Sequence, residues 1–536
     1  MKNKLPFFIF ALFSFAEIAF SQAPVLSPAG GGSYRDVIKI IDEISPKQRS
    51  AIINMLRSNE AILRSANKIA TQANTTATAF EWPLKQALGY NDNGFYGISN
   101  YVDEDPTFPN NVLDYNCGKR SYDQSSGYNH QGTDIFTWPF FWEKMATNAV
   151  EIIAAAPGTI IGKSDGNFDQ NCAFCTNCDW NAVYVMQADG SVCWYGHMKL
   201  GSLTAKAVGE TVAVGEYLGI VGSSGNSTGP HLHFEVYTNS TYSQLVDPWA
   251  GDCNNHNGQT SWWANQQPYY VPTISKVMTH GAPPVHTDCN TGEASNIKMN
   301  YASGDTLYVG SYYRDQMNGE QATHRIYYPD NTVWQTWVSV FNIYYSASWW
   351  WYYLILPATA PTGTWKYEVT YNGKKSTAYF TVNNAPLVTC PLNYTFITSN
   401  LKGTTYQWQV DTGSGFTDIT DNIYYKTTNS SQLQLTPAVP TSFYGYQYRC
   451  LVDAASYSNI IAIKFTSNWT GGKNTAWEDP FNWSCGNVPD SNTDVVIKND
   501  VINFPEINSD AVCRSTSVSP AATLTVNTGF KLTVTH

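Results

Sequence analysis

Four histidines and one aspartate occur in three short motifs whose residue types can bind a metal ion and move protons. The motifs are HQGTD at residues 130–134, YGHM at 195–198 and GPHLHFE at 229–235. On a β-strand, residues i and i+2 point to the same face, so His231 and His233 can converge on one groove. His130 and Asp134 share a face of an extended segment for the same reason. Because zinc binds imidazole nitrogen and carboxylate oxygen, these residues predict a metal site.

The number of candidate side chains indicates a catalytic metal rather than a structural one. A catalytic zinc has three protein ligands and one open position, whereas a structural zinc has four protein ligands. Four histidines and one aspartate therefore leave two imidazoles beyond the ligands. Beside a metal-activated water, one imidazole can accept a proton and the other can stabilise an oxyanion or protonate a leaving amine. The sequence thus points to metal-assisted hydrolysis.

The three motifs, in this order, resemble the lysostaphin-type zinc metallopeptidases, also called β-lytic or duplicated-hybrid-motif peptidases. The resemblance covers about residues 80–250 and includes the intervening segments APGT at 156–159, NAVYV at 181–185 and GSSG at 222–225. It implies an antiparallel β-sheet with one catalytic zinc at the floor of an open groove. It also implies that the metal ligands are His130, Asp134 and His233 and that the catalytic histidines are His197 and His231.

The resemblance implies a zinc metalloendopeptidase that hydrolyses peptide bonds. Members of the family cut peptidoglycan cross-links, often at glycyl bonds, and some secreted members degrade Gly-rich proteins. We therefore expect peptidoglycan peptides as the substrate. The alternatives are a protease of Gly-rich proteins and a non-catalytic cell-wall-binding surface protein. Loss of His197 or His231 would favour the binding protein, and both residues are present.

Residues 167–180 form an insert that departs from the family pattern. The insert contains Cys172, Cys175 and Cys178, and Cys193 follows nearby. Four cysteines at this spacing are compatible with a second zinc, but an exported protein favours disulfides. If Cys253 pairs with Cys289, Cys117 joins these four cysteines to make five, which leaves one thiol unpaired. The implied fold places the insert near the groove rim, where it would influence substrate choice.

The N-terminal residues have the features of an exported protein. Residues 1–21 combine two lysines, an apolar stretch and a small-x-small cleavage site, which is typical of a signal peptide. Residues 22–33 resemble a tether, and apolar periodicity over 34–73 predicts two amphipathic helices, the second starting with a capping box at Ser45. The segment 22–79 is interpreted as a pro-segment or as an N-terminal packing element.

Composition excludes several classes of protein. The 536 residues carry a net charge of −11, with 14 % charged and 14 % aromatic residues. These values argue against a disordered chain or a coiled coil. No basic block suggests a nucleic-acid partner. After the signal no apolar run is long enough for a transmembrane segment, so the protein is expected in the periplasm, at the cell surface or outside the cell.

The fold class expected is mainly β, with further β domains after the metallopeptidase domain at 80–275. A β-sandwich is expected at 287–385, an immunoglobulin-like domain at 386–466 and another β-rich module at 467–536. Cys390, Trp408, Tyr448 and Cys450 have the immunoglobulin order, which predicts a Cys390–Cys450 bridge. A Cys485–Cys513 pair is a further expectation. The last module resembles modules near the C-termini of large secreted proteins of Bacteroidetes-type bacteria, and no sorting domain is evident after it.

Two features of these C-terminal domains leave alternatives open. The aromatic run at 349–353 (WWWYY) is compatible with a sugar-stacking surface, but a strand buried between a sheet and a neighbouring domain is favoured. The domains are expected to hold the enzyme on a cell surface or polymer. The five remaining histidines are not expected to be catalytic; they are His256, His280, His286, His324 and His536.

Overall fold

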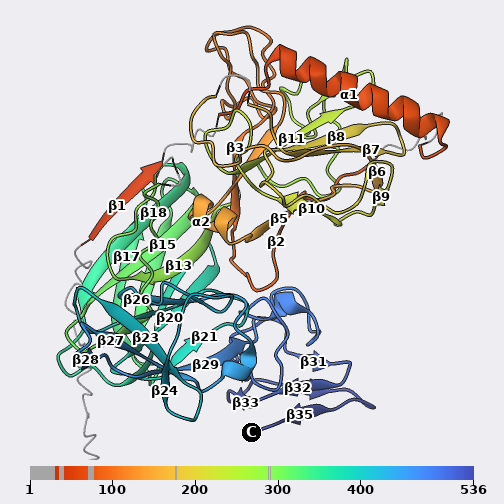
Figure 1. Cartoon of the computed structure of the whole chain (residues 1–536). Coiled ribbons are helices and arrows are strands. Elements are labelled where there is room, and N and C mark those ends of the chain that lie inside the picture. Colours follow the sequence, from red (N-terminus) through yellow and green to blue (C-terminus); the bar gives the residue numbers. More distant parts are fainter. Residues whose placement is uncertain (1–29, 36–40, 70–77, 176–177, 288, 290) are drawn as a thin grey trace, which may run out of the picture.

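The structure is a computed structural model that describes residues 30–35, 41–69, 78–175, 178–287, 289 and 291–536. The expected signal peptide and most of the expected tether lie outside the described residues. The described chain is mainly β, as expected, and forms a succession of β-rich units (Figure 1). Within the described residues, no helix combines the length and hydropathy needed to span a membrane.

The three motifs lie in an antiparallel sheet within residues 80–270. Across this sheet the strands are β3 (Tyr96–Asn100), β4 (Thr133–Thr137), β11 (His231–Tyr237), β8 (Val192–Gly196), β7 (Ala182–Gln187), β6 (Gly158–Ser164) and β9 (Thr211–Val212), with β12 (Leu245–Val246) beside β11. A second sheet contains β10 (Tyr217–Ile220), β5 (Val150–Ile153) and β2 (Leu84–Gln86), and α2 (Phe141–Ala146) precedes β5. Strands β7 and β8 form the expected hairpin, and Gly190 supplies the positive φ of 86° in its turn.

The described part of the N-terminal segment contains one helix, where two were expected. Helix α1 (Pro46–Ser65) starts with the expected capping box, in which Ser45 and Gln48 satisfy each other's backbone N–H groups. The prediction of an earlier helix is wrong for the described residues. Tyr34 and Arg35 belong to strand β1 (Gly30–Arg35), and Ile41–Ile44 is not helical because Asp42 pairs with Ser227 in an antiparallel bridge.

The next unit is a β-sandwich of two sheets. One sheet has the order β1, β18 (Tyr345–Ile355), β15 (Thr306–Gln316) and β13 (Thr273–His280); the other has the order β14 (Asn300–Tyr301), β20 (Lys374–Val382), β19 (Gly363–Tyr371), β16 (Gln321–Tyr327) and β17 (Val333–Val340). The sandwich therefore includes β13, upstream of the expected start at residue 287. Trp349 of β18 is buried against Trp138 and Phe136 of the motif-bearing unit, as the favoured interpretation of the aromatic run expects. The interpretation holds only for this residue, because residues 350–352 are half-buried and Tyr353 is exposed.

The last part of the chain continues one sheet from an immunoglobulin-like unit into the C-terminal module. This sheet has the order β24 (Phe416–Asp418), β23 (Tyr406–Asp411), β27 (Gln447–Val452), β29 (Ile461–Asn468), β30 (Asp494–Ile497) and β33 (Ser515–Val518), with β21 (Leu387–Thr389) beside β29 and β28 (Ser456–Tyr457) beside β27. The facing sheet contains β22 (Thr395–Thr398), β26 (Gln432–Leu435) and β25 (Tyr425–Lys426). Two short strand pairs complete the module: β31 (Glu506–Ile507) with β34 (Thr525–Val526), and β32 (Ala511–Cys513) with β35 (Leu532–Val534). Two single 3-10 turns, η1 (Thr441–Phe443) and η2 (Pro480–Asn482), also occur in this part of the chain.

The immunoglobulin-type core is present but its predicted bridge is wrong. Trp408 and Tyr448 are buried in this core, as expected. Cys390 instead pairs with Cys485, and Cys450 and Cys513 are buried free thiols. The strand register explains this pairing. Because β21 runs parallel to β29 with Thr389 opposite Phe465, Cys390 lies beside Thr466. The Sγ of Cys485 contacts the carbonyl of the same Thr466.

Disulfides also join the earlier cysteines. The pairs are Cys117–Cys253, Cys172–Cys289 and Cys175–Cys178, whereas Cys193 is buried and unpaired. The insert is therefore held by disulfides, as favoured, and a Cys253–Cys289 pair does not occur. The Cys172–Cys289 bridge ties the insert to the segment that follows β13.

Candidate metal centre

Strand register brings the predicted site residues together at one place on the sheet. His233 of β11 lies directly opposite Asp134 of β4 on one side and opposite Gly196 of β8 on the other. His197 follows Gly196, and its φ of 58° turns the chain out of the strand at this point. His231 is two residues before His233 on the same face. All five predicted residues are buried: His130, Asp134, His197, His231 and His233.

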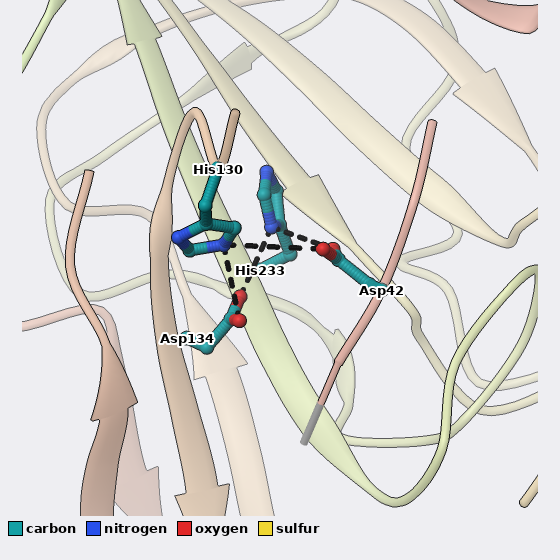
Figure 2. Close-up of side chains that lie close together, drawn as sticks. All are labelled: Asp42, His130, Asp134 and His233. Atoms are coloured by element: carbon teal, nitrogen blue, oxygen red, sulfur yellow. Dashed lines mark hydrogen bonds and ion pairs between the residues drawn. The ribbon is translucent and has the colours of Figure 1, made fainter. Parts of the chain in front are cut away.

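The three predicted ligands present their donor atoms to a common point (Figure 2). Nε2 of His130 lies 3.0 Å from Oδ2 of Asp134. Nδ1 of His233 lies 3.0 Å from Oδ1 of the same carboxylate. Two imidazole nitrogens and a carboxylate around one point match the donor set of a zinc site.

Hydrogen bonds from the far side of each imidazole fix which nitrogen faces this point. Nδ1 of His130 bonds the carbonyl of Tyr101 at 2.7 Å, so its Nε2 is free to bind a metal. For His233 the arrangement is reversed, because Nε2 lies 3.1 Å from Oε2 of Glu235 and Nδ1 faces the site. Such outer contacts orient metal-binding histidines and select their tautomer.

The two predicted catalytic histidines are oriented in the same way. Nδ1 of His197 bonds the carbonyl of Ser224 at 2.6 Å, and Nδ1 of His231 bonds the carbonyl of Gly229 at 2.8 Å. Nε2 of His231 is buried and has no hydrogen-bond partner among the described residues, which fits a group that binds a substrate or water. Burial and the neighbouring His231 lower the pKa of His197, which favours the neutral imidazole that can accept a proton.

Two motif glycines are required by close packing at the site. A Cβ on Gly132 would lie 2.6 Å from Nε2 of His233, and a Cβ on Gly196 would lie 2.1 Å from the ring of Trp180. Trp180, the last residue of the insert, packs edge-on against His197 with ring centroids 5.1 Å apart. The insert therefore contributes directly to the wall of the site.

Asp42 is a member of the cluster that the sequence analysis missed. Its Oδ2 lies 2.8 Å from Nδ1 of His233 and 2.9 Å from Nε2 of His197, and its Oδ1 lies 3.9 Å from Nε2 of His130. Although burial opposes ionisation, His233 and the other imidazoles hold the pKa of Asp42 well below its usual range. A charged carboxylate thus lies between the predicted ligands and the predicted catalytic pair. Asp42 stands outside the three motifs, and only its place in a possible pro-segment could have drawn attention to it.

The backbone around Asp42 pairs like a strand with residues 226–228. Thr228 exchanges bonds with Ile41, its N–H donating to the Ile41 carbonyl at 3.2 Å and its Oγ1 accepting from the Ile41 N–H at 2.9 Å. The Tyr122 hydroxyl donates to the Asp42 carbonyl at 2.8 Å and also contacts its carboxylate. Asp42 therefore blocks the site with both backbone and side chain fixed.

Helix α1 covers the sheet next to the site and is joined to it by a buried ion pair. Leu56 and Leu63 are buried against a cluster that includes Tyr184 and Trp194. Arg49 forms an ion pair with Glu235, the residue that orients His233, with a second contact of 3.2 Å from Nη2 to Oε2. Burial opposes ionisation of Glu235, but Arg49 and His233 lower its pKa to about 2.

A cavity of about 190 Å³ remains between α1 and the insert. Its lining includes Gln48 and Ile52 of α1, Trp180 of the insert, and His197. Gln48 also donates to the carbonyl of Cys178 at 2.7 Å, so helix and insert meet at the rim. The described histidines outside the motifs are not part of this site: His280 and His324 are buried in the sandwich, where burial lowers their pKa values to about 4 and about 3.

Comparison with known proteins identifies the region that contains the site. Residues 128–248, which hold all five predicted residues, match peptidase family M23, and residues 468–536 match a domain of unknown function (DUF8693). The expected lysostaphin-type peptidase domain is thereby confirmed. A 68-residue segment is 44 % identical to the DD-carboxypeptidase/endopeptidase Mpg of Neisseria meningitidis and of Neisseria gonorrhoeae. The match covers 13 % of this chain and only 14 % of each relative.

Solved structures similar to parts of the chain include two M23 proteins and a titin fragment. A variant catalytic domain of the prophage-encoded M23 protein EnpA from Enterococcus faecalis is 22 % identical, with 33 % of this chain and 96 % of that one covered and a TM-score of 0.16. A putative M23 peptidase from Pseudomonas aeruginosa is 19 % identical, with 40 % and 64 % covered and a TM-score of 0.18. The titin domains I67–I69 are 15 % identical, with 30 % and 75 % covered and a TM-score of 0.13.

Proposed function

We propose that the protein is an exported zinc metalloendopeptidase that hydrolyses peptide bonds in peptidoglycan cross-links. The observation that carries the proposal is the convergence of His130, Asp134 and His233 beside two further imidazoles, each with one nitrogen fixed and the other facing the site. Four disulfides support export, because such bonds persist in oxidising compartments.

In this proposal the residues divide into three ligands and two proton-transfer groups. His130 Nε2, Asp134 and His233 Nδ1 would hold the zinc, which when bound supplies a Lewis acid for activating water and polarising a carbonyl. Neutral His197 accepts a proton from the attacking water. His231, whose Nε2 faces the site, stabilises the developing oxyanion or protonates the leaving amine.

The family match and the named relatives support the proposed substrate class. The Neisseria relatives are described as a DD-carboxypeptidase/endopeptidase, an activity that supports peptidoglycan peptides as the substrate here. A Gly-rich protein is the second candidate. A non-catalytic binding protein is disfavoured because all five chemical groups are present and oriented.

We also propose that the N-terminal segment is a latency device. Asp42 places its carboxylate within 2.9 Å of both a proposed ligand and a proposed catalytic histidine, where a substrate carbonyl or water would have to be. Residues 41–44 follow the groove beside Asn226–Thr228, and α1 covers the adjacent sheet. Removal of the segment after export would open the site.

The deciding experiment compares product formation with and without metal. The full chain and the Asp42→Ala variant are incubated with peptidoglycan sacculi and with pentaglycine, each with and without a chelator, and products are identified by mass spectrometry. New amino termini that vanish with chelator and return with zinc are expected. Cleavage that survives thorough metal removal would refute the mechanism, and absence of cleavage by both forms would favour a binding protein.

A further inference from the structure

The outer edge of β18 carries a strand made largely of glycine. Strand β1 pairs with it antiparallel over six residues, as Figure 1 shows beside the sandwich. The register places Gly30, Gly31 and Gly32 opposite Tyr352, Trp351 and Trp350 respectively. Three consecutive glycines therefore face three consecutive large aromatic residues.

This pairing is unusual for a sheet edge. Glycine is a poor strand former because it has no side chain to pack and loses much backbone entropy. A large aromatic residue opposite a glycine can lie across the exposed backbone and compensate for this weakness. The aromatic side chains at 350–352 are half-buried with β1 in place; Trp350 and Tyr352 pack toward the sandwich core, and Trp351 packs on Tyr308. The edge is thus suited to a strand with little or no side chain at these positions.

The edge also lies close to the metal centre along the chain. Arg35 ends β1, and Ile41 begins the segment that enters the groove. Six residues span at most about 22 Å when fully extended. An extended polypeptide docked on β18 can therefore reach the groove, as the chain's own N-terminal segment does.

We propose that the outer edge of β18 at residues 347–352 is a docking site for an extended glycine-rich segment of a protein. Strand β1 holds this edge in the full chain, and the site becomes available when β1 leaves. An ordinary polypeptide is favoured over a short glycine bridge because the six-residue ladder continues through Ser33, Tyr34 and Arg35. The inference deepens the proposed function by favouring the second candidate substrate, but it is tested by binding rather than by turnover.

The test first vacates the edge. In a His231→Ala background, which prevents cleavage, the double change Gly31→Pro and Gly32→Pro removes two successive strand N–H groups. Because successive N–H groups of a strand point in opposite directions, one of the two must face β18. A fluorescent hexapeptide with the sequence of residues 30–35 should then bind the double-proline variant at least about tenfold more tightly than it binds the chain in which β1 is seated. In that chain the tethered strand competes with the peptide at high effective concentration.

Matched variants of β18 separate edge binding from groove binding. Trp351 and Tyr353 share a face and both contact Tyr308, but only Trp351 lies within the β1 register. Trp351→Thr should abolish the gain in affinity, whereas Tyr353→Thr and Trp351→Phe should retain it. If the gain in peptide affinity survives Trp351→Thr, or if Asp42→Ala alone reproduces it, the peptide binds in the groove instead. Either result would overturn the proposal.

Other peptides test the stated chemistry of the ligand. A hexapeptide with valine in place of the three glycines should not compete for the vacated edge. Equal affinities of the two hexapeptides would overturn the proposed preference for glycine. If pentaglycine binds as tightly as the hexapeptide with the sequence of residues 30–35, the site would be assigned to a cell-wall glycine bridge instead. Dimers of the proline variant, detected by light scattering, would show that a second copy occupies the edge. Each result is obtained without turnover and so is independent of whether the chain is an active peptidase.

Discussion

The carboxylate of Asp42 lies 2.8 Å from Nδ1 of His233, the nitrogen that the far-side contact with Glu235 leaves facing the metal centre. A side chain from the N-terminal segment thus competes for the same donor atom that a metal ion would use. The same oxygen lies 2.9 Å from Nε2 of His197. The N-terminal segment therefore reaches both halves of the proposed catalytic machinery through one residue.

Asp42→Ala should raise the peptidase rate of the full chain by about tenfold or more, which corresponds to ~1.4 kcal/mol. The reason is that the change removes the carboxylate that occupies the site while α1 stays docked. Initial rates on dye-labelled sacculi measure the effect. Glu43→Ala is the matched control, because Glu43 is the adjacent carboxylate and lies outside the cluster. Equal rates for Asp42→Ala and the parent chain would contradict the latency proposal.

His233→Ala and His231→Ala should separate metal binding from turnover. Loss of His233 removes a proposed ligand, so zinc content measured by elemental analysis should fall well below one ion per chain. Loss of His231 should leave zinc bound and reduce turnover by about 10²-fold or more, as expected for a proton-transfer group. If the two variants retain zinc equally, the assignment of ligands and catalytic histidines is wrong.

The sequence predicted which five residues the structure brings together, because local spacing determines where they point. Their division into metal ligands and catalytic histidines stays a prediction. His231 and His233 are two apart on one strand, whereas the placement of that strand between β4 and β8 is a tertiary feature that the motif order does not give. Asp42 escaped prediction because its position depends on a bridge to Ser227, 185 positions later in the chain, and no spacing rule predicts such a contact. Where the structure describes the predicted first helix, the prediction failed for the same reason: tertiary pairing of residues 41–44 outweighed apolar periodicity.

The cysteine pairings show a similar limit. The order Cys390…Trp408…Cys450 correctly predicted an immunoglobulin-like core with Trp408 buried. The bridge depends instead on which strand lies beside Cys390, and parallel pairing of β21 with β29 brings it to Cys485. Composition and spacing contain no information on that register.

Thiol titration should find three free cysteines in the unreduced, denatured protein. The four disulfides leave Cys193, Cys450 and Cys513, all buried in the native state. Burial raises the pKa values of Cys450 and Cys513 to about 11, so neither should react in the folded protein at neutral pH. Peptide mapping that recovers a Cys390–Cys450 peptide in place of Cys390–Cys485 would contradict the structure.

Arg49→Met should destabilise the docked N-terminal segment. The change leaves the carboxylate of Glu235 buried without its cation, and breaking a buried pair in this way costs about 3–5 kcal/mol. Urea unfolding measures the loss in free energy of unfolding. Arg57→Met is the matched control on the same helix, because the bond from Arg57 to the carbonyl of Thr241 is exposed.

A double change isolates the charge from the packing of Arg49. Adding Glu235→Gln to Arg49→Met removes the orphaned charge and should recover much of the lost stability. An equal loss in the single and double variants would show that the contact of the Arg49 guanidinium with the ring of Trp194, rather than the ion pair, holds α1 in place.

A buried carboxyl pair away from the metal centre should make stability depend on pH. Asp247 and Glu104 are both buried, and burial together with the carboxylate of Glu104 raises the pKa of Asp247 well above its usual value. A raised carboxyl pKa means that the folded chain binds the proton more tightly than the unfolded chain. Its contribution to stability is therefore complete below about pH 4 and is lost as pH rises through the folded-state pKa.

Asp247→Asn should remove this part of the pH dependence, because an amide cannot ionise and can donate to Glu104. The free energy of unfolding of the parent should fall between pH 4 and pH 8, by up to about 1.4 kcal/mol per pH unit for each proton released, and the variant should fall less. As pH rises, the free energy of unfolding of the variant should therefore increase relative to that of the parent. Asp252→Asn, a change at an exposed carboxylate in the same loop, is the control and should follow the parent. Parallel pH profiles for the parent and Asp247→Asn would show that the pair is charged in the folded protein and that a bound cation compensates it.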